Sequence, residues 1–352
     1  MGGKRKVVPF LMVLAAVGAV LASPTAGVAA FPGLNGKISV TAIGTGTYDI
    51  WTLNADGSGA TNLTPNDVFD VEARWSPDGS RIAFSSSRDL VSMEIYVMNA
   101  DGTGVTQITH HPFEDRQPAW SPDGSQIAFL SNRDETPTSW LDLYVMNADG
   151  TGVTRLTDTP DGVEVDPAWS PDGTRIAFAS ARPAGTDIFT INPDGTGETN
   201  LTNSPRLDQS PSWSPDGSRI AYTNQRTGHF EIEVMDANGS NVVALTAAGV
   251  DSRTPAWSPD ETKIAFIRKI SAPDFDLWTM NADGSGQANI TNTLDRQEFD
   301  PDWQPTGPLE SCPDGSDPDG LVTGLIEDLE PALGPIGPIV HTLNCTLADL
   351  GL

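Results

Sequence analysis

Acidic residues stand at nearly fixed distances before each of six regularly spaced tryptophans. An acid lies five positions before the tryptophan in five cases, at Asp70, Asp115, Glu164, Asp208 and Glu298. Asp251 stands six positions before its tryptophan, and Asp166 and Asp300 stand three positions before theirs. Calcium prefers carboxylate oxygens as ligands, and two carboxylates about 5–10 Å apart can hydrolyse a glycosidic bond. The pattern leaves a calcium site and a glycan-active enzyme open.

Arginines repeat in step with these acids. Each follows by four residues the aromatic residue that ends an Ile-Ala-Phe or Ile-Ala-Tyr stretch, and the set is Arg88, Arg133, Arg182 and Arg226. The simplest interpretation is that acids and arginines form structural ion pairs between neighbouring repeat units. The alternative is that both sets face a ligand or a protein partner, because loops on a rigid scaffold usually carry recognition.

The tryptophans belong to a repeat, with successive spacings of 45, 49, 44, 44 and 46 residues between Trp75, Trp120, Trp169, Trp213, Trp257 and Trp303. Four of them begin the sequence Trp-Ser-Pro-Asp-Gly. An alternating apolar run follows, such as 81–84, then a second run, such as 95–98, and an Asn-Ala-Asp-Gly turn. This alternation predicts strands joined by tight hairpins. One aromatic residue at the same place in every unit indicates packing between units.

The two ends of the repeat complement each other. The first unit, from Asn35, lacks its Trp strand, whereas the Trp303 strand has no strands after it. If the last strand completes the first unit, the chain closes into a ring without exposed edges. A period of about 45 residues is typical of four-stranded propeller blades. We therefore predict an all-β fold, a six-bladed β-propeller over residues 31–307, in which the acids approach the mouth of a central channel.

The motifs Trp-Ser-Pro-Asp-Gly, Arg-Ile-Ala-Phe and Tyr-Val-Met-Asn-Ala-Asp-Gly resemble the WD40-like (PD40) repeats of the TolB-type β-propeller family. The resemblance covers about residues 31–307 and implies the fold. It suggests a role in an envelope assembly, although propellers host many unrelated activities. The α/β domain that precedes the propeller in TolB does not fit between Ala30 and Gly36, so the resemblance is to the propeller part alone.

The segments on either side of the repeat differ from it. Residues 1–30 have a basic start, an apolar stretch at 7–22 and a small-residue end at Ala30, which is the layout of a secretory signal peptide cleaved before Phe31. The mature protein is then secreted or periplasmic. Residues 308–352 are expected to form a C-terminal extension of short helices, closed by a disulfide between Cys312 and Cys345; a free thiol pair is the alternative.

The net charge of the chain limits the classes of ligand that it can bind. The chain of 352 residues carries 20 Lys and Arg against 47 Asp and Glu, a net charge of -27, which excludes nucleic acid and disfavours anionic membranes. We expect a monomeric, non-catalytic binding or scaffold propeller that engages a protein partner through one loop face and needs no cofactor. The alternatives are the glycan-active enzyme and a calcium-stabilised structural propeller. We expect no membrane insertion of the mature chain.

Overall fold

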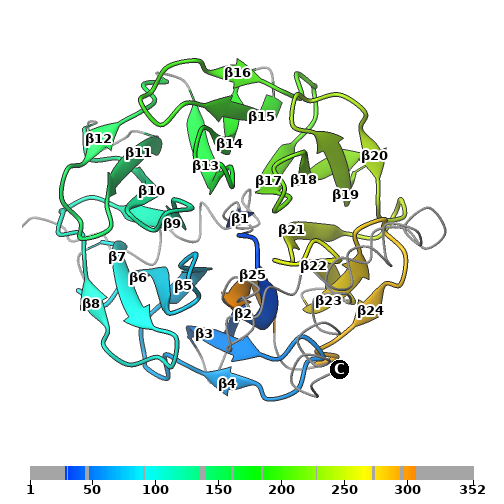
Figure 1. Cartoon of the computed structure of the whole chain (residues 1–352), viewed down its shortest axis with the longest axis horizontal. Coiled ribbons are helices and arrows are strands. Elements are labelled where there is room, and N and C mark those ends of the chain that lie inside the picture. Colours follow the sequence, from blue (N-terminus) through cyan, green and yellow to red (C-terminus); the bar gives the residue numbers. More distant parts are fainter. Residues whose placement is uncertain are drawn as a thin grey trace, which may run out of the picture.

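The fold is a ring of six antiparallel, four-stranded sheets around a central axis, as the repeat predicted (Figure 1). The computed structural model describes residues 28–29, 31–43, 47–89, 92–134, 140–159, 162–183, 185–226, 228–271, 274–293 and 297–306. In this part of the chain every regular element is a strand. Most of the predicted signal peptide lies outside the described residues, and so does the predicted extension with Cys312 and Cys345.

Each sheet is one blade, and its strands follow one another from the axis outwards. Blade 1 contains β25 (Glu298–Thr306), β2 (Leu34–Ile43), β3 (Tyr48–Leu53) and β4 (Thr61–Asn62). Blade 2 contains β5 (Asp70–Trp75), β6 (Arg81–Ser86), β7 (Glu94–Asn99) and β8 (Thr106–Gln107). Blade 3 contains β9 (Asp115–Trp120), β10 (Gln126–Ser131), β11 (Asp142–Asn147) and β12 (Thr154–Arg155).

The remaining blades repeat this order. Blade 4 contains β13 (Val163–Trp169), β14 (Ile176–Arg182), β15 (Gly185–Ile191) and β16 (Thr199–Asn200). Blade 5 contains β17 (Asp208–Trp213), β18 (Arg219–Arg226), β19 (His229–Asp236) and β20 (Val243–Ala244). Blade 6 contains β21 (Ser252–Trp257), β22 (Lys263–Lys269), β23 (Phe275–Asn281) and β24 (Ala288–Asn289).

The ring closes as predicted, because the last strand becomes the inner strand of the first blade. β25 pairs antiparallel with β2, with Trp303 opposite Ile38 and Glu298 opposite Ala42. The turn after β3 packs against blade 6, at the boundary between the first blade and the last. Gly57 has φ +85°, and a Cβ built on it would lie 1.8 Å from the carbonyl oxygen of Ile290 in blade 6. Only glycine allows this approach.

The blade connections divide the disc into two faces. The Trp-Ser-Pro-Asp-Gly turns join the first strand to the second, and the Asn-Ala-Asp-Gly turns join the third to the fourth; together they form what we call the turn face. The other two connections of each blade lie at the opposite ends of the strands and form the loop face. An antiparallel blade requires this separation, because successive turns alternate between its two ends.

Every inner strand carries a β-bulge three residues before its tryptophan. The bulge residues all have positive φ, between 53° and 61°, although none is glycine; they are Glu72, Gln117, Asp166, Ser210, Thr254 and Asp300. Register shifts occur at the same place in all six inner pairs. Positive φ is uncommon for such residues and persists only where neighbouring structure holds it.

A short additional strand lies at the axis. The backbone of β1 (Val28–Ala29) pairs in parallel with β17, opposite Ser212 and Trp213, and lies near the centre of the ring (Figure 1). These two residues belong to the predicted signal peptide, so cleavage before Phe31 would remove the strand. Phe31 itself is buried against the hydrophobic core of blades 2 to 5.

The tryptophans pack between blades. All six are buried, and three donate their indole N–H to a carbonyl oxygen of the preceding blade, at 3.2–3.3 Å: Trp120 to Arg74, Trp213 to Ala168 and Trp303 to Ala256. The buried aromatic area and the hydrogen bond together fix the angle between successive blades.

Candidate functional site

The acids five positions before tryptophan do not form an exposed ring at the channel mouth. All five are buried, and they belong to the loop-face ends of the inner strands. Their register partners lie on the second strand of the same blade; Asp70 is opposite Ser86, Asp115 opposite Ser131 and Glu164 opposite Ser180. Because neighbouring side chains cover them, these carboxylates are positioned to stiffen the blade.

The arginine pairs lie within blades, so the expectation that they join neighbouring blades is wrong. Arg88 donates from Nε and Nη2 to both oxygens of Asp70, at 3.0 and 2.8 Å, and both residues belong to blade 2. Arg133 donates to Asp115 at 2.6 Å within blade 3. Each guanidinium also lies over two aromatic rings of its own blade, Phe84 and Tyr96 for Arg88, and Phe129 and Tyr144 for Arg133. The bidentate, stacked arrangement of Arg88 is one that arginine makes and lysine does not.

Blades 4 and 5 depart from this arrangement. Arg182 pairs with Glu198 at 2.8 Å, whereas Glu164 accepts a hydrogen bond from Ser180 at 3.1 Å. Burial raises the pKa of Glu164 to about 7. Asp208 accepts hydrogen bonds from Asn224 and Ser204, and burial raises its pKa as well. The side chain of Arg226, the fourth predicted arginine, lies outside the described residues.

Blades 6 and 1 differ again. Asp251 has three basic neighbours, with His229 at 3.4 Å, Lys269 at 3.7 Å and Arg253 at 3.8 Å. Among the described residues Glu298 forms no ion pair, and it accepts hydrogen bonds from Thr293 at 2.9 Å and Thr291 at 3.1 Å. Burial raises the pKa of Glu298 to about 7. The loop-face acids thus have different partners from blade to blade.

The bulge residues link neighbouring blades. Gln117 donates its backbone N–H to Glu72 at 3.0 Å, Asp166 to Gln117 at 2.9 Å, and Ser210 to Asp166 at 2.9 Å. At two further junctions the acceptor is a threonine of the preceding blade; Glu72 donates to Thr41 and Thr254 to Thr223. These bonds hold the bulges in their positive-φ conformation. Asp166 therefore acts as a clamp between blades 4 and 5.

Charged side chains lie where blades 1, 2 and 3 meet. Arg116 pairs with Glu72 at 3.0 Å, and Asp302 accepts the backbone N–H of Trp75 at 2.7 Å. Burial raises the pKa values of Asp300 and Asp302 to about 7, although the Arg74 guanidinium opposes that shift. All of these acids are buried. Raised pKa values accompany catalysis in many enzymes but also arise in structural networks.

No group of three or more His, Cys, Asp or Glu side chains in the described residues is arranged to hold a metal ion. The acid ring proposed as a calcium site is divided among separate partners, as described above. Within the same part of the chain, no helix has the length and apolarity needed to cross a bilayer.

A continuous row of aromatic side chains runs along the loop face. Ring centroids lie 5.9 Å apart for Phe69 and Tyr48, 6.1 Å for Tyr48 and Phe299, and 6.1 Å for Phe299 and Phe275. We call this row, with Arg253 and Phe230, the aromatic arc. Its members come from strand ends and loops of blades 1, 5 and 6 and from the loop before blade 2.

Arginine extends the arc at one end. The Arg253 guanidinium lies 3.8 Å from the ring centre of Phe230 and 5.4 Å from that of Phe275. Phe69 at the other end is 42% exposed. The other rings of the arc are half-buried. Partly exposed aromatic rings together with an arginine have the composition of protein-binding surfaces. Tyr48, Phe230 and Phe275 hold one position of the repeat, and Arg253 and Phe299 hold another. Sequence reasoning missed the arc because the residue type at these positions varies from blade to blade, so no repeating motif marks it.

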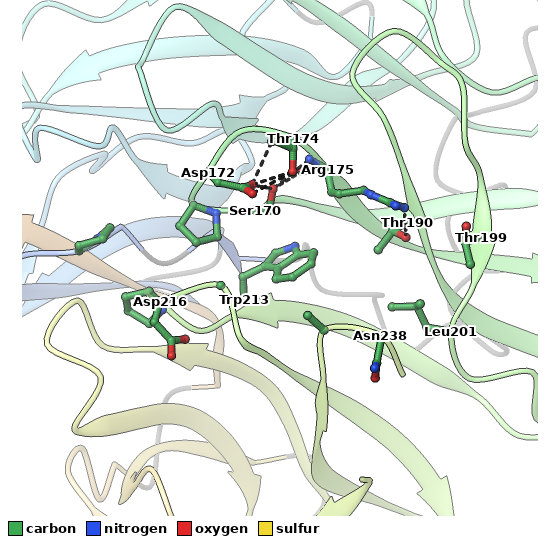
Figure 2. Close-up of a pocket in the computed structure, with 15 residues that line it drawn as sticks. Ser170, Asp172, Thr174, Arg175, Thr190, Thr199, Leu201, Trp213, Asp216 and Asn238 are labelled. Carbon is green, nitrogen blue, oxygen red and sulfur yellow. Dashed lines mark hydrogen bonds between the residues drawn. The ribbon is translucent and has the colours of Figure 1, made fainter. Parts of the chain in front are cut away.

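A pocket of about 670 Å³ opens on the turn face between blades 4 and 5 (Figure 2). Trp213, Leu201 and Pro32 supply apolar walls, and Asp172 and Asp216 come from two successive Trp-Ser-Pro-Asp-Gly turns. This volume is within the usual range for ligand pockets. The pocket lies on the face opposite the aromatic arc.

Comparison with known proteins supports the propeller assignment. Residues 158–309 match the family described as TolB beta propeller domain, and residues 38–151 match the family described as Tricorn protease N-terminal beta propeller domain. Comparison with the curated proteins finds no match. The two family models adjoin each other and together extend over nearly all the described residues.

Solved structures share the architecture at low sequence identity. TolB from Acinetobacter baumannii superposes with a TM-score of 0.67 at 21% identity, covering 84% of this chain and 71% of that one. A putative TolB from Agrobacterium tumefaciens gives 0.60 at 19% identity, covering 77% and 99%. A chain from a nidogen/laminin complex gives 0.57 at 13% identity, covering 76% and 98%. These identities establish the fold alone; with the family matches, they identify the chain as carrying a TolB-like, six-bladed β-propeller.

Proposed function

We propose that this protein is an exported, non-catalytic propeller that binds a protein partner through the aromatic arc on its loop face. The contiguity of Phe69, Tyr48, Phe299, Phe275 and Phe230 with Arg253 carries the proposal. Rigid aromatic side chains bury a large area for little loss of conformational entropy, so they commonly dominate the energy of interfaces.

Charge indicates what kind of protein would bind. With a net charge of -27, the chain attracts basic surfaces and repels acidic ones over a Debye length. We expect a partner whose apolar patch is bordered by lysine or arginine. The predicted binding residues Arg88, Arg133 and Arg182 keep part of their side chains exposed on this face, and their paired acids hold them in place.

The buried carboxylates argue for binding rather than glycan hydrolysis. Asp70 and Asp115 are already bonded to arginine, whereas hydrolysis needs two available acids with different environments. Asp300 and Asp302 have raised pKa values but are covered by the surrounding strands. A substrate could reach neither pair without opening the ring.

Export is the second half of the proposal. The layout of residues 1–30 predicts a signal peptide cleaved before Phe31. Intact-mass measurement of the protein secreted by a host that expresses the full chain tests this prediction. A mature N-terminus at Phe31 is expected, and a mass that retains residues 1–30 would contradict it.

The binding test uses the full chain and two surface variants. Phe69→Ser with Phe299→Ser interrupts the arc, while Val243→Ser removes an exposed apolar side chain on blade 5, outside the arc. Cross-linking in envelope extract, followed by mass spectrometry, identifies partners whose contact the purified proteins then reproduce. We expect the arc variant to lose a reproducible partner that the Val243→Ser variant retains.

Equal capture by all three proteins would remove the arc from the proposal. Capture of nothing by the wild-type chain, with and without calcium, would reject protein binding under these conditions. Thermal melting of each variant first establishes that both remain folded, because a misfolded variant would lose the partner for a trivial reason.

A further inference from the structure

The pocket between blades 4 and 5 exists because one arginine departs from the arrangement of its counterparts. Three blades carry an arginine at the start of their second strand or directly before it, at Arg81, Arg175 and Arg219. Arg81 lies over Trp120 of the next blade at 4.7 Å from the ring centre, and Arg219 lies over Trp257 at the same distance. Arg175 instead donates a hydrogen bond to Thr190 at 3.1 Å, so it and Trp213 lie on different walls of one pocket (Figure 2).

A single side chain accounts for the difference. Thr190 is opposite Ala177 in the sheet, and its hydroxyl accepts the Arg175 hydrogen bond. The equivalent residues are Val97, opposite Ala83, and Val234, opposite Ala221. Valine offers no acceptor. In blades 2 and 5 the arginine therefore stacks on the tryptophan of the next blade, whereas in blade 4 it is held back by Thr190.

The rim of the pocket is acidic. Asp172 and Asp216 line it, each at the exposed tip of its turn. Burial raises the pKa of each carboxyl, but hydrogen bonds from the neighbouring serine and threonine hydroxyls and amides outweigh it and leave both values lowered. Both groups are therefore carboxylates at neutral pH. Asn238 adds an amide to the same rim.

We propose that this pocket binds a guanidinium group, stacked against Trp213 as Arg81 and Arg219 stack on their tryptophans, with the Asp172 and Asp216 carboxylates as its polar partners. An aromatic ring attracts a cation most strongly when the cation is shielded from water. The guanidinium belongs either to an arginine of a polypeptide or to a free guanidino compound. The site lies on the turn face and does not depend on the proposed arc.

In this site Arg175 is an internal competitor of the ligand for the face of Trp213. Thr190→Val removes its acceptor and recreates the valine environment of blades 2 and 5. Arg175 then moves over Trp213 and fills the site, although no wall of the pocket has been deleted. Thr279→Val in blade 6 is the matched control, because Thr279 holds the same repeat position away from this pocket, opposite Ala265.

Ligand-observed and ¹⁵N-resolved NMR of the full chain test the proposal. The probes are Nα-acetyl-argininamide, its neutral isostere Nα-acetyl-citrullinamide, agmatine, and the peptide acetyl-Gly-Arg-Gly-amide. We expect the arginine probe to shift the Trp213 indole N–H signal and to bind at least about tenfold more tightly than the citrulline probe. Tighter binding of the peptide than of agmatine would identify a polypeptide as the source, and the reverse would identify a free guanidino compound.

The variants supply the decisive comparison. Thr190→Val and Asp216→Asn should each weaken binding of the arginine probe by about tenfold or more. Thr279→Val, and Asp123→Asn in the corresponding turn of blade 3, should leave it unchanged. Equal binding of arginine and citrulline probes, no effect of Thr190→Val, or binding of neutral saccharides without binding of arginine would each overturn the proposal.

Discussion

The ion pair between Arg88 and Asp70 offers a quantitative test of how the blades are stabilised. Arg88→Gln removes two charge-assisted hydrogen bonds, at 3.0 and 2.8 Å, from a carboxylate that is fully buried. Removing one partner of a buried pair typically costs about 3–5 kcal/mol. Asp70 keeps hydrogen bonds from Ser86 at 2.5 Å and Asn66 at 2.7 Å, and the Arg88 side chain is 25% exposed. These features reduce the expected loss of unfolding free energy to about 2–3 kcal/mol.

Arg182→Gln is the matched control. Arg182 and Glu198 are also 2.8 Å apart, but their side chains are 32% and 35% exposed. Exposed pairs contribute about 0–1 kcal/mol, so this variant should lose about 1 kcal/mol or less, including the contact of Arg182 with Phe189. The two variants thus remove the same chemical group, and the pairs differ in the burial of the acid and in the number of hydrogen bonds to it.

Urea unfolding followed by tryptophan fluorescence measures both changes, provided that the variants share the wild-type dependence on denaturant. A double-mutant cycle with Asp70→Asn then isolates the pair from other effects of Arg88. We expect a coupling energy of about 2 kcal/mol for this buried pair. Equal losses for Arg88→Gln and Arg182→Gln, or additive losses in the cycle, would refute the assignment of Arg88 and Asp70 as a structural pair.

Three further perturbations follow from the fold. Gly57→Ala should cost about 2 kcal/mol or more, because its Cβ meets the Ile290 carbonyl, whereas Gly228→Ala, with φ +86° and open space, should cost only about 1 kcal/mol; chemical denaturation distinguishes them. Burial raises the pKa of Glu298 in the folded protein to about 7 from an ordinary 4.5. The protonated side chain therefore contributes fully to the free energy of unfolding below pH 4.5, and this contribution is lost as the pH rises towards 7. Glu298→Gln should remove about 3 kcal/mol of this pH dependence, which melting at several pH values measures. Chelation of calcium should leave the melting temperature of the full chain unchanged, since the loop-face acids have protein partners, and a fall of about 5 °C would reinstate the calcium-stabilised propeller.

Periodicity made the architecture predictable. The repeat of Trp-Ser-Pro-Asp-Gly identified the inner strands, and the missing strand before Asn35 matched the surplus strand at Trp303, as the pairing of Ile38 with Trp303 confirms. Both inferences depend on backbone pairing, which every blade must satisfy in the same way. Side-chain direction was less accessible. The acids were expected to pair with arginines of neighbouring blades, whereas the pairing of Asp70 with Ser86 brings Asp70 and Arg88 together within one blade.

Proline accompanies five of the six bulges. In five inner strands a proline stands two residues before the tryptophan, directly after the bulge residue, as in Asp166-Pro167 and Thr254-Pro255. Proline inside a sheet is confined to edges and bulges, because it cannot donate to the ladder. The inner strand is the edge strand of its blade in the ring, so proline at this position is compatible with a bulge but does not by itself require one. Only blade 2 lacks the proline, and it has the same bulge, at Glu72, because its inner strand has the same geometry as those of the other blades.

Functional specificity in this ring resides where a blade departs from the repeat. One position before each bulge, blades 2 and 4 carry Val71 and Val165, whereas blades 6 and 1 carry Arg253 and Phe299, which build the aromatic arc. Likewise Thr190 stands where blades 2, 3 and 5 carry valine, and its hydrogen bond with Arg175 leaves the pocket beside Trp213 open. A residue type that all blades share is explained by packing, which every blade requires. A residue that differs from its counterparts in the other blades is not required for that packing, so its side chain is available to contact a ligand.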